Sequence, residues 1–78
     1  MWCVYILKSK NYKKSYVGSS DNPLRRLAEH NSGKSAYTKR FMPWEILKTE
    51  EFMTYTEARK RENFYKTGVG RQELKKLF

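Results

Sequence analysis

The sequence is poor in acidic residues and in sulfur ligands. Among its 78 residues there are one cysteine and eight acidic residues, of which Asp21 is the only aspartate. A single cysteine excludes an internal disulfide and a cysteine-based zinc finger. So few carboxylates also argue against a centre built from several clustered acidic groups, such as a two-metal site.

Long apolar runs are missing as well. No segment has the length to span a bilayer, and none has the pattern of a basic amphipathic helix with a continuous apolar face, so we expect no membrane association. The first ten residues, MWCVYILKSK, lack the charged start and the apolar length of a signal peptide, so we expect a cytoplasmic protein. A chain of this length predicts one domain, residues 1–78, which buries only about 60% of its unfolded surface and has no room for an interdomain cleft.

Positive charge is abundant. The chain carries 17 lysines and arginines against 8 acidic residues, a formal net charge of +9, and such an excess attracts polyanions. The basic residues are spread along the whole chain and interleaved with tyrosine and tryptophan, which is typical of a folded phosphate-binding surface. Nucleic acid is therefore the expected partner, with a charge that serves only solubility as the alternative.

The order of apolar runs, caps and turn residues predicts an α+β fold. A three-stranded antiparallel sheet is flanked by helices, in the order strand, strand, helix, short helix, strand, helix, helix. The first two strands are joined by a short polar loop that contains three lysines, as in a hairpin. Strands are expected at residues 2–7, 15–19 and 44–52, a loop or short helix within 34–43, and helices from about 23 to 31, at 54–67 and at 72–77.

Capping residues set the expected helix ends. Ser20 or Asp21 is expected to cap the first helix, Pro23 lies in its first turn, and Gly33 suits a left-handed residue after its end. The buried stripe of this helix is predicted to be Leu24, Leu27 and Ala28. In the later helix, Thr54 and Glu57 have the spacing of a capping box.

Two polar residues of the first helix share a face. Arg26 and His30 are four residues apart, so they lie one above the other, beside the predicted apolar stripe. Taken alone, this pair is best interpreted as a solvated polar edge.

Glu62 is expected on the core side of the later helix, because Ala58, Glu62 and Tyr65 fall on one stripe at helical period. A carboxylate is rarely buried without compensation, so an arginine, a lysine or a metal ion must accompany it. A structural salt bridge with an arginine of the first helix and a metal-ligand role are equally good explanations at this point.

Two tyrosines lie on the strands of the predicted hairpin. Tyr5 and Tyr16 are either ordinary strand aromatics or members of a site. A phenol has a pKa near 10, so it is a poor base unless nearby cations lower that pKa. Gly18, directly after Tyr16 and Val17, would let a backbone or a phosphate come close.

In combination these residues resemble the GIY-YIG nuclease superfamily. Cys-Val-Tyr at residues 3–5 and Tyr-Val-Gly at 16–18 stand where the family has Gly-Ile-Tyr and Tyr-Ile-Gly, and Arg26, His30 and Glu62 follow in the family's order. The stretch YVGSSDNPLRRLAEHNSG is similar to small single-domain members related to the N-terminal endonuclease module of the repair subunit UvrC. The chain departs from many members by lacking an asparagine within residues 68–78.

The resemblance implies an endonuclease that hydrolyses DNA phosphodiester bonds in repair or recombination, with structure-specific cleavage as one form that this activity takes. It implies one divalent cation, Mg²⁺ or Mn²⁺, held by Glu62. Tyr5 and Tyr16 would orient or deprotonate the attacking water, Arg26 would stabilise charge on the phosphate, and His30 would transfer a proton or contact the phosphate. One protein carboxylate suffices for Mg²⁺, which keeps most of its waters.

Three further residues are candidates for nucleic-acid contact. Tyr37, Lys39 and Arg40 would meet the backbone or stack on a base, or else belong to a solvated basic loop. Two other functions remain open at this point. One is a non-catalytic nucleic-acid-binding module, and the other is an interaction domain that presents an exposed segment, residues 37–44, to a larger repair or recombination enzyme.

Overall fold

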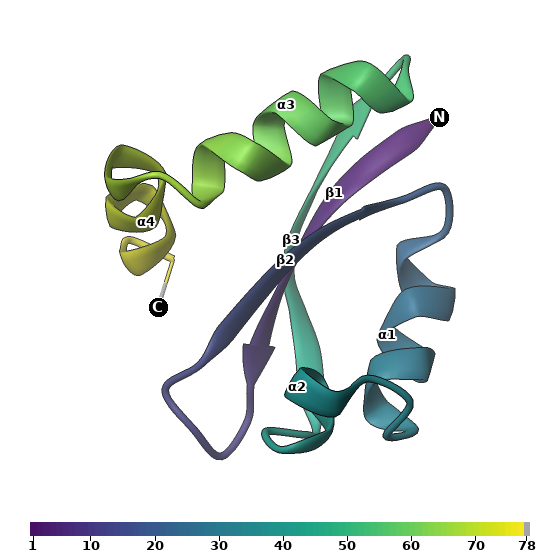
Figure 1. The fold of residues 1–78 in the computed structure, drawn as a ribbon, viewed down its shortest axis with the longest axis vertical. Coiled ribbons are helices and arrows are strands. Elements are labelled where there is room, and N and C mark those ends of the chain that lie inside the picture. Colours follow the sequence, from purple (N-terminus) through teal and green to yellow (C-terminus); the bar gives the residue numbers. More distant parts are fainter. Residues whose placement is uncertain (78) are drawn as a thin grey trace.

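The computed structural model describes residues 1–77 and confirms the predicted α+β fold. Strands β1 (Trp2–Ser9), β2 (Ser15–Ser20) and β3 (Trp44–Phe52) form one antiparallel sheet in the order β2-β1-β3 (Figure 1). The central strand is an aromatic and β-branched run that suits a sheet buried on both faces. The outer strand β2 pairs only with β1, so its other edge is free of strand pairing.

Four helices within the described residues cover the sheet. They are α1 (Pro23–Asn31), α2 (Ala36–Lys39), α3 (Tyr55–Tyr65) and α4 (Gly68–Lys75). Helices α3 and α4 lie to one side of the strands and α1 and α2 to the other (Figure 1). Within residues 1–77 no helix has the length and apolarity needed to cross a membrane.

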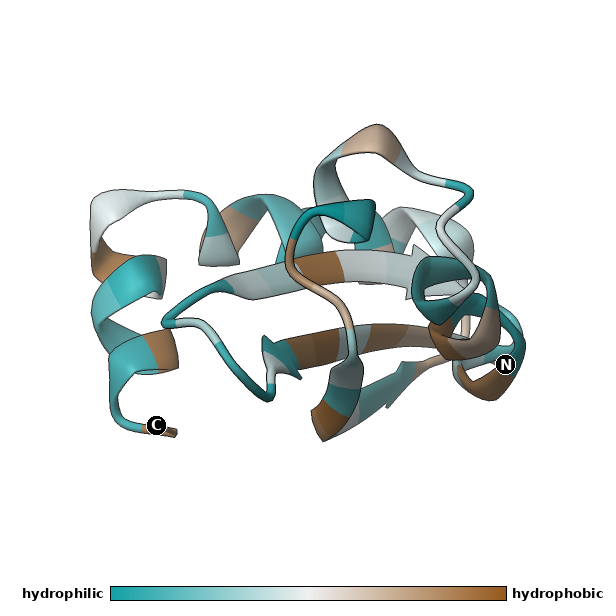
Figure 2. Ribbon diagram, turned by 90° about the horizontal axis from the view of Figure 1, so that it is seen from below, coloured by the Kyte–Doolittle hydropathy of each residue, from teal (hydrophilic) through white to brown (hydrophobic). Residues whose placement is uncertain are grey.

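The alternation of β1 divides the core between the two faces. Val4 and Ile6 pack with Ala58 of α3 and with Leu74 of α4. On the other face, Tyr5, Leu7 and Trp44 form a second cluster, with Tyr16, Leu27, Phe41 and Ile46 packed against it. Hydrophobic residues are accordingly frequent in the sheet, whereas the helices contain many hydrophilic residues (Figure 2).

The buried side of α1 differs from the prediction. Leu24 is 71% exposed and Ala28 is exposed too, while His30 is buried and Arg26 and Leu27 are half-buried. The helix therefore turns its polar Arg26–His30 face toward the sheet. Of the predicted apolar stripe, Leu27 packs against the cluster of Tyr5, Leu7 and Trp44, whereas Leu24 and Ala28 lie on the exposed side of the helix.

The ends of α1 are set by Asn22 and Gly33. The cap is Asn22, whose side chain accepts from the backbone N–H of Arg25, and not Ser20 or Asp21. The Ser20 hydroxyl instead accepts from the backbone N–H of Asn22 at 2.9 Å, which shapes the turn before the helix. Gly33 has a φ of +84°, so the left-handed residue predicted after the helix is confirmed.

The last two helices also differ in their limits. Thr54 caps α3 through the backbone N–H of Glu57, as the capping-box spacing predicts. Helix α4 begins at Gly68, four residues earlier than predicted, because Gly70 does not interrupt it. A Cβ at position 70 would collide with the backbone of Phe64 and Tyr65, so this glycine lets α4 pack closely against the end of α3.

Candidate active site

Tyr5 and Gly18 face each other across the β1–β2 pair. They are register partners, and a Cβ at position 18 would lie 2.5 Å from the Tyr5 hydroxyl oxygen. The phenol therefore occupies the space over Gly18 and extends toward the free edge of β2. The close approach predicted at Gly18 is made here by the Tyr5 ring, and contact between Gly18 and a phosphate stays a prediction.

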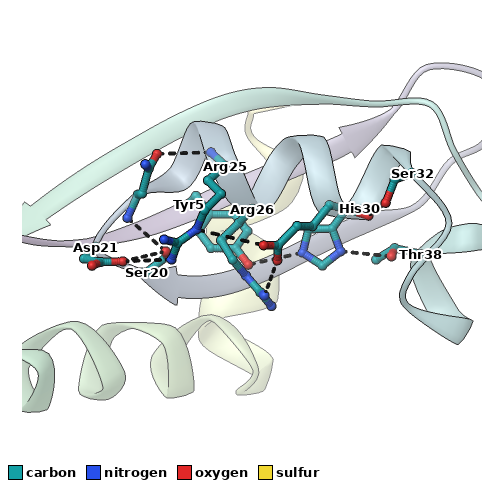
Figure 3. A network of polar contacts seen from close by, with 10 residues as sticks. Tyr5, Ser20, Asp21, Arg25, Arg26, His30, Ser32 and Thr38 are labelled. Atoms are coloured by element: carbon teal, nitrogen blue, oxygen red, sulfur yellow. Dashed lines mark hydrogen bonds and ion pairs between the residues drawn. The ribbon is translucent and has the colours of Figure 1, made fainter.

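A buried polar chain runs from Tyr5 into α1 and α2. The Tyr5 hydroxyl lies 3.2 Å from His30 Nε2, and His30 Nδ1 lies 2.9 Å from Thr38 Oγ1 (Figure 3). We assign the tautomer in which Nδ1–H donates to Thr38 and Nε2 accepts from Tyr5. Burial, reinforced by the charge of Arg26, lowers the pKa of His30, so the imidazole is neutral at neutral pH.

The phenol of Tyr5 is protonated at neutral pH. Burial is the largest influence and raises its pKa, and the charge of Glu62 adds to the rise. A hydrogen bond from Arg26 and the charge of its guanidinium act in the opposite direction without overcoming burial. The nearby cations therefore do not lower the pKa of this phenol, and ionised Tyr5 requires a group that takes its proton. The neutral Nε2 of His30 is such a group.

Arg26 and Tyr16 complete this side of the site. Arg26 Nη1 donates to Glu29 Oε1 at 2.6 Å, and its side chain is 39% exposed, so part of the guanidinium remains accessible. The Tyr16 ring lies beside the imidazole of His30, with ring centroids 4.7 Å apart, and its centroid is 6.2 Å from that of Tyr5. A hollow of about 310 Å³ opens over Arg26 and His30. Four of the predicted residues are thus neighbours.

Glu62 reaches the same edge of β2 from the opposite face. Its side chain is 6% exposed, Ser19 Oγ donates to Oε1 at 2.7 Å, and Oε2 accepts from Lys66 Nζ at 2.7 Å and Arg59 Nη1 at 3.1 Å. The compensating cations come from its own helix (Arg59) and from the residue that follows it (Lys66), which corrects the alternative of a first-helix arginine. Burial tends to raise the pKa of Glu62, but Lys66, Ser19 and Arg59 outweigh it and hold the pKa below its usual value. The carboxylate is therefore ionised at neutral pH.

The two halves of the site meet across β2. Gly18 and Ser19 are consecutive, so one lies under the Tyr5 phenol and the other points to Glu62. The negative charge of Glu62 also contributes to raising the pKa of Tyr5. The site is therefore an open strand edge with a carboxylate on one side and a phenol, an imidazole and a guanidinium on the other.

The donor set around Glu62 suits a single hard cation. Within residues 1–77 no three histidine, cysteine or acidic side chains come together as a metal cluster. Two cationic side chains already bind Oε2, so the pocket favours positive charge at that oxygen. A single carboxylate fits a hard cation such as Mg²⁺ or Mn²⁺, which keeps most of its water ligands, and does not fit a tightly caged ion such as structural Zn²⁺.

The residues predicted for nucleic-acid contact are only partly assembled. Tyr37 is 45% exposed and its ring centroid lies 6.4 Å from that of Tyr16, so it borders the site. Arg40 lies over the Phe41 ring at 5.6 Å, and the stem of Lys39 lies beside Gly33. Trp44 is buried, so residues 37–44 are not the continuous exposed segment that an interaction domain was expected to present.

Two hydroxyl residues of the site were not predicted from the sequence. Ser19 and Thr38 carry hydroxyls that contact Glu62 and His30, but hydroxyl residues are frequent in this sequence and nothing in the pattern singled these two out. Thr38 is held in turn by Trp44, whose Nε1 donates to its backbone carbonyl at 2.8 Å. The Asn31 side chain ties the end of α1 to the backbone of Trp44.

Comparison with known proteins identifies the family. Residues 1–75 match the family model described as the GIY-YIG catalytic domain. The chain belongs to the GIY-YIG family. The match covers both tyrosine tripeptides and Glu62, and it confirms the predicted family and enzyme class.

Relatives of this GIY-YIG domain fall into two groups. A UPF0213 protein of Staphylococcus haemolyticus is 40% identical over 75 residues, covering 95% of this chain and 90% of that protein. Structure-specific endonuclease subunit SLX1 of Phaeosphaeria nodorum is 44% identical over 50 residues, covering 58% of this chain but 14% of that protein. The solution NMR structure of a UPF0213 protein from Bacillus halodurans is similar, with a TM-score of 0.56 and 31% identity, over 99% of this chain and 85% of that one. The chain therefore matches only a small part of the fungal proteins.

Proposed function

We propose that this GIY-YIG domain is a divalent-metal-dependent endonuclease that hydrolyses DNA phosphodiester bonds. The observation that supports it most is the arrangement of a proton-accepting pair, Tyr5 and His30, and an ionised carboxylate, Glu62, on the two sides of one strand edge. Phosphodiester hydrolysis needs little beyond positioning, an acceptor for one proton and stabilisation of charge on the phosphoryl oxygens.

Glu62 is the proposed ligand of the cation, Mg²⁺ or Mn²⁺. When bound there, the metal would act as a Lewis acid toward an oxygen of the scissile phosphate. Ser19 donates a hydrogen bond to Oε1. Oε2 is therefore the oxygen at which a metal cation would replace the amine of Lys66. Lys66 and Arg59 are roughly half-exposed, so both can swing away from this oxygen at small cost.

Tyr5 and His30 are the proposed route for the proton of the attacking water. As water attacks phosphorus, its proton moves to the Tyr5 oxygen while the phenolic proton moves to Nε2 of His30. A new phosphorus–oxygen bond forms, the bond to the leaving oxygen breaks, and that oxygen takes a proton from solvent. His30 becomes cationic in this step, and its Nδ1–H bond to Thr38 keeps the ring in place.

Arg26 and Tyr16 support this chemistry. The accessible part of the Arg26 guanidinium faces the hollow over His30, where it would pair with phosphoryl oxygens and stabilise the charge that develops on them. Tyr16 packs against the imidazole and limits its rotation, and its hydroxyl is a second group for orienting the water. Tyr37, Lys39 and Arg40 remain proposed contacts to the DNA outside this centre.

The biological setting is proposed from the relatives. The fungal relatives are named as subunits of structure-specific endonucleases, so we propose branched or nicked DNA as substrate and a larger repair or recombination protein as partner.

A non-catalytic nucleic-acid-binding module is the competing function. It is favoured by one observation, the occupation of Glu62 Oε2 by two cationic side chains that a metal must displace. It predicts binding without turnover at any metal concentration.

Cleavage assays separate the two functions. Purified protein is incubated with branched, nicked and single-stranded DNA in Mg²⁺ or Mn²⁺, beside Glu62→Gln and the matched control Glu73→Gln, which changes an exposed glutamate of α4. We expect wild type and Glu73→Gln to cut and Glu62→Gln to lose cleavage at least 100-fold. Cleavage that survives in Glu62→Gln or in EDTA would overturn the proposed mechanism.

A further inference from the structure

A second hollow adjoins the candidate active site. It has a volume of about 480 Å³ and lies between the β1–β2 hairpin, α2 and α4. In Figure 1 the hairpin loop and α4 lie on the same side of the molecule. Most of its lining lies outside the catalytic arrangement described above, and it shares only Tyr16 and Lys66 with that arrangement.

Its lining is cationic. Lys13 and Lys14 come from the hairpin, Lys66 from the segment after α3, and Arg71 and Lys75 from one face of α4, and no acidic residue contributes to the lining. Arg71 and Lys75 are four residues apart on the helix and are both exposed, so they point the same way. Four of these five cations, all but Lys66, form no ion pair with a carboxylate of residues 1–77, and positive charge gathered around one concavity attracts an anion with several charges.

The rest of its lining includes aromatic and apolar residues. Tyr16, Tyr37 and Leu74 are among them, and the Tyr37 ring is 45% exposed. Tyr37 continues through Phe41 to Tyr12 in a row of rings with centroid separations of 5.3 and 5.5 Å. Cations beside an exposed ring suit a nucleotide, because the phosphate pairs with the cations and the sugar or base packs on the ring.

The hollow and the candidate active site lie along one strand edge. Ser15, Tyr16 and Val17 border the hollow, and the next two residues of β2, Gly18 and Ser19, border the site. Two side chains belong to both, since Tyr16 packs on His30 and Lys66 pairs with Glu62. From Tyr16 to Ser19 the strand advances roughly 10 Å, a length over which one nucleic-acid strand presents several phosphates.

We propose that this hollow binds the phosphates of the nucleic-acid strand on one side of the bond that is cut. The inference rests on the proposed function, because the neighbouring site determines which strand enters the hollow. Lys66 links the two: it neutralises Glu62 in the free protein, and it is released to a backbone phosphate when a cation takes the carboxylate oxygen.

The proposal is tested with two double variants that remove the same amount of positive charge, one inside the hollow and one outside it. Arg71→Gln/Lys75→Gln removes two cations from the hollow, and Lys48→Gln/Lys60→Gln removes two exposed cations from β3 and α3 that do not line it. Binding of a labelled DNA oligonucleotide is measured by fluorescence anisotropy without divalent metal, at several salt concentrations. Lys13→Gln/Lys14→Gln, on the opposite wall, serves as an independent third variant, and circular dichroism checks the fold of each.

The hollow variants should lose at least tenfold in affinity at low salt and reduce the slope of log K against log salt by about 1.4 to 1.8, the value for two phosphate contacts. The Lys48/Lys60 variant should lose less than threefold. Equal losses in all three would overturn the proposal, because net charge alone would then account for binding. Competition by inorganic phosphate as strong as that by the oligonucleotide would also overturn it, since the hollow would then be a small-anion site.

The assay does not depend on catalysis. A protein that binds through the hollow but never cuts would refute the proposed function, and of this inference only the binding of nucleic-acid phosphates in the hollow would stand. A protein that cuts with unchanged KM in the Arg71→Gln/Lys75→Gln variant would refute this inference alone.

Discussion

The ring of Tyr5 fills the space that a side chain at position 18 would need, since a Cβ there would lie 2.5 Å from the phenolic oxygen. The two residues are partners in adjacent strands, and the absence of a side chain at one lets the other extend to the sheet edge. Gly18, the last residue of Tyr-Val-Gly, therefore makes room for the ring of Tyr5, the tyrosine of Cys-Val-Tyr.

Gly18→Ala should displace the Tyr5 phenol. The backbone at Gly18 is not left-handed, so the cost comes from the clash, and we expect a loss of about 1–3 kcal/mol in the free energy of unfolding. Displacement of the reacting group should lower kcat by about 100-fold. Gly68→Ala is the control, because nothing lies within 4 Å of its Cβ position, and it should leave both quantities nearly unchanged or raise stability slightly. Equal behaviour of the two variants would contradict the role given to Gly18.

Stability should fall as the pH drops from about 7.5 to 5.5. His30 is the only histidine, and burial followed by the charge of Arg26 lowers its pKa in the folded state, with Glu29 acting in the opposite direction. Below about pH 6.5, the ordinary pKa of histidine, His30 is protonated in the unfolded chain but stays neutral in the folded chain. The free energy of unfolding therefore falls as the pH drops. Urea unfolding at several pH values measures this slope. In His30→Gln the free energy of unfolding should depend less on pH over this range. An unchanged dependence would mean that other titrating groups cause it.

Thr38→Val should impair the proton relay through the orientation of His30. The substitution keeps the shape but removes the acceptor of the Nδ1–H bond, leaving a buried donor unsatisfied at a cost of about 1–3 kcal/mol. We expect kcat to fall with KM nearly constant and the acidic limb of the pH–rate profile to move. Thr38→Ser restores the oxygen and should restore the profile. If Thr38→Ser behaves like Thr38→Val, the residue contributes packing only.

Lys66→Met should strengthen binding of a divalent cation in the absence of nucleic acid. Its amine lies 2.7 Å from Glu62 Oε2, the oxygen that the cation needs. Removing this partly exposed competitor should tighten Mn²⁺ binding about two- to fivefold, followed by electron paramagnetic resonance of the free ion. Lys75→Met changes a cation of α4 that does not touch Glu62 and should have no such effect. Weaker binding in Lys66→Met would mean that lysine and metal share the carboxylate.

Much of the fold followed from local patterns. The strand of residues 44–52, the cap at Thr54 and the left-handed Gly33 were predicted because each depends on nearest neighbours in sequence. The start of α4 was not, because the need for glycine at position 70 arises from the backbone of Phe64 and Tyr65 in another helix. The hydrophobic pattern also predicted the wrong buried face for α1. The half-buried Leu27 shares that face with His30, whereas Leu24 is exposed.

By itself, the sequence determined which chemical groups this protein holds and the elements that carry them: two phenols on paired strands, a guanidinium and an imidazole one helical turn apart, and a carboxylate on the inner face of a later helix. These follow from period and order along the chain. Only the tertiary structure decided that the groups divide between two faces of the sheet and meet at the unpaired edge of β2. The physical reason is that consecutive residues of a strand face opposite sides of the sheet. Gly18 therefore lies against the Tyr5 phenol on one face, while Ser19 contacts Glu62 on the other.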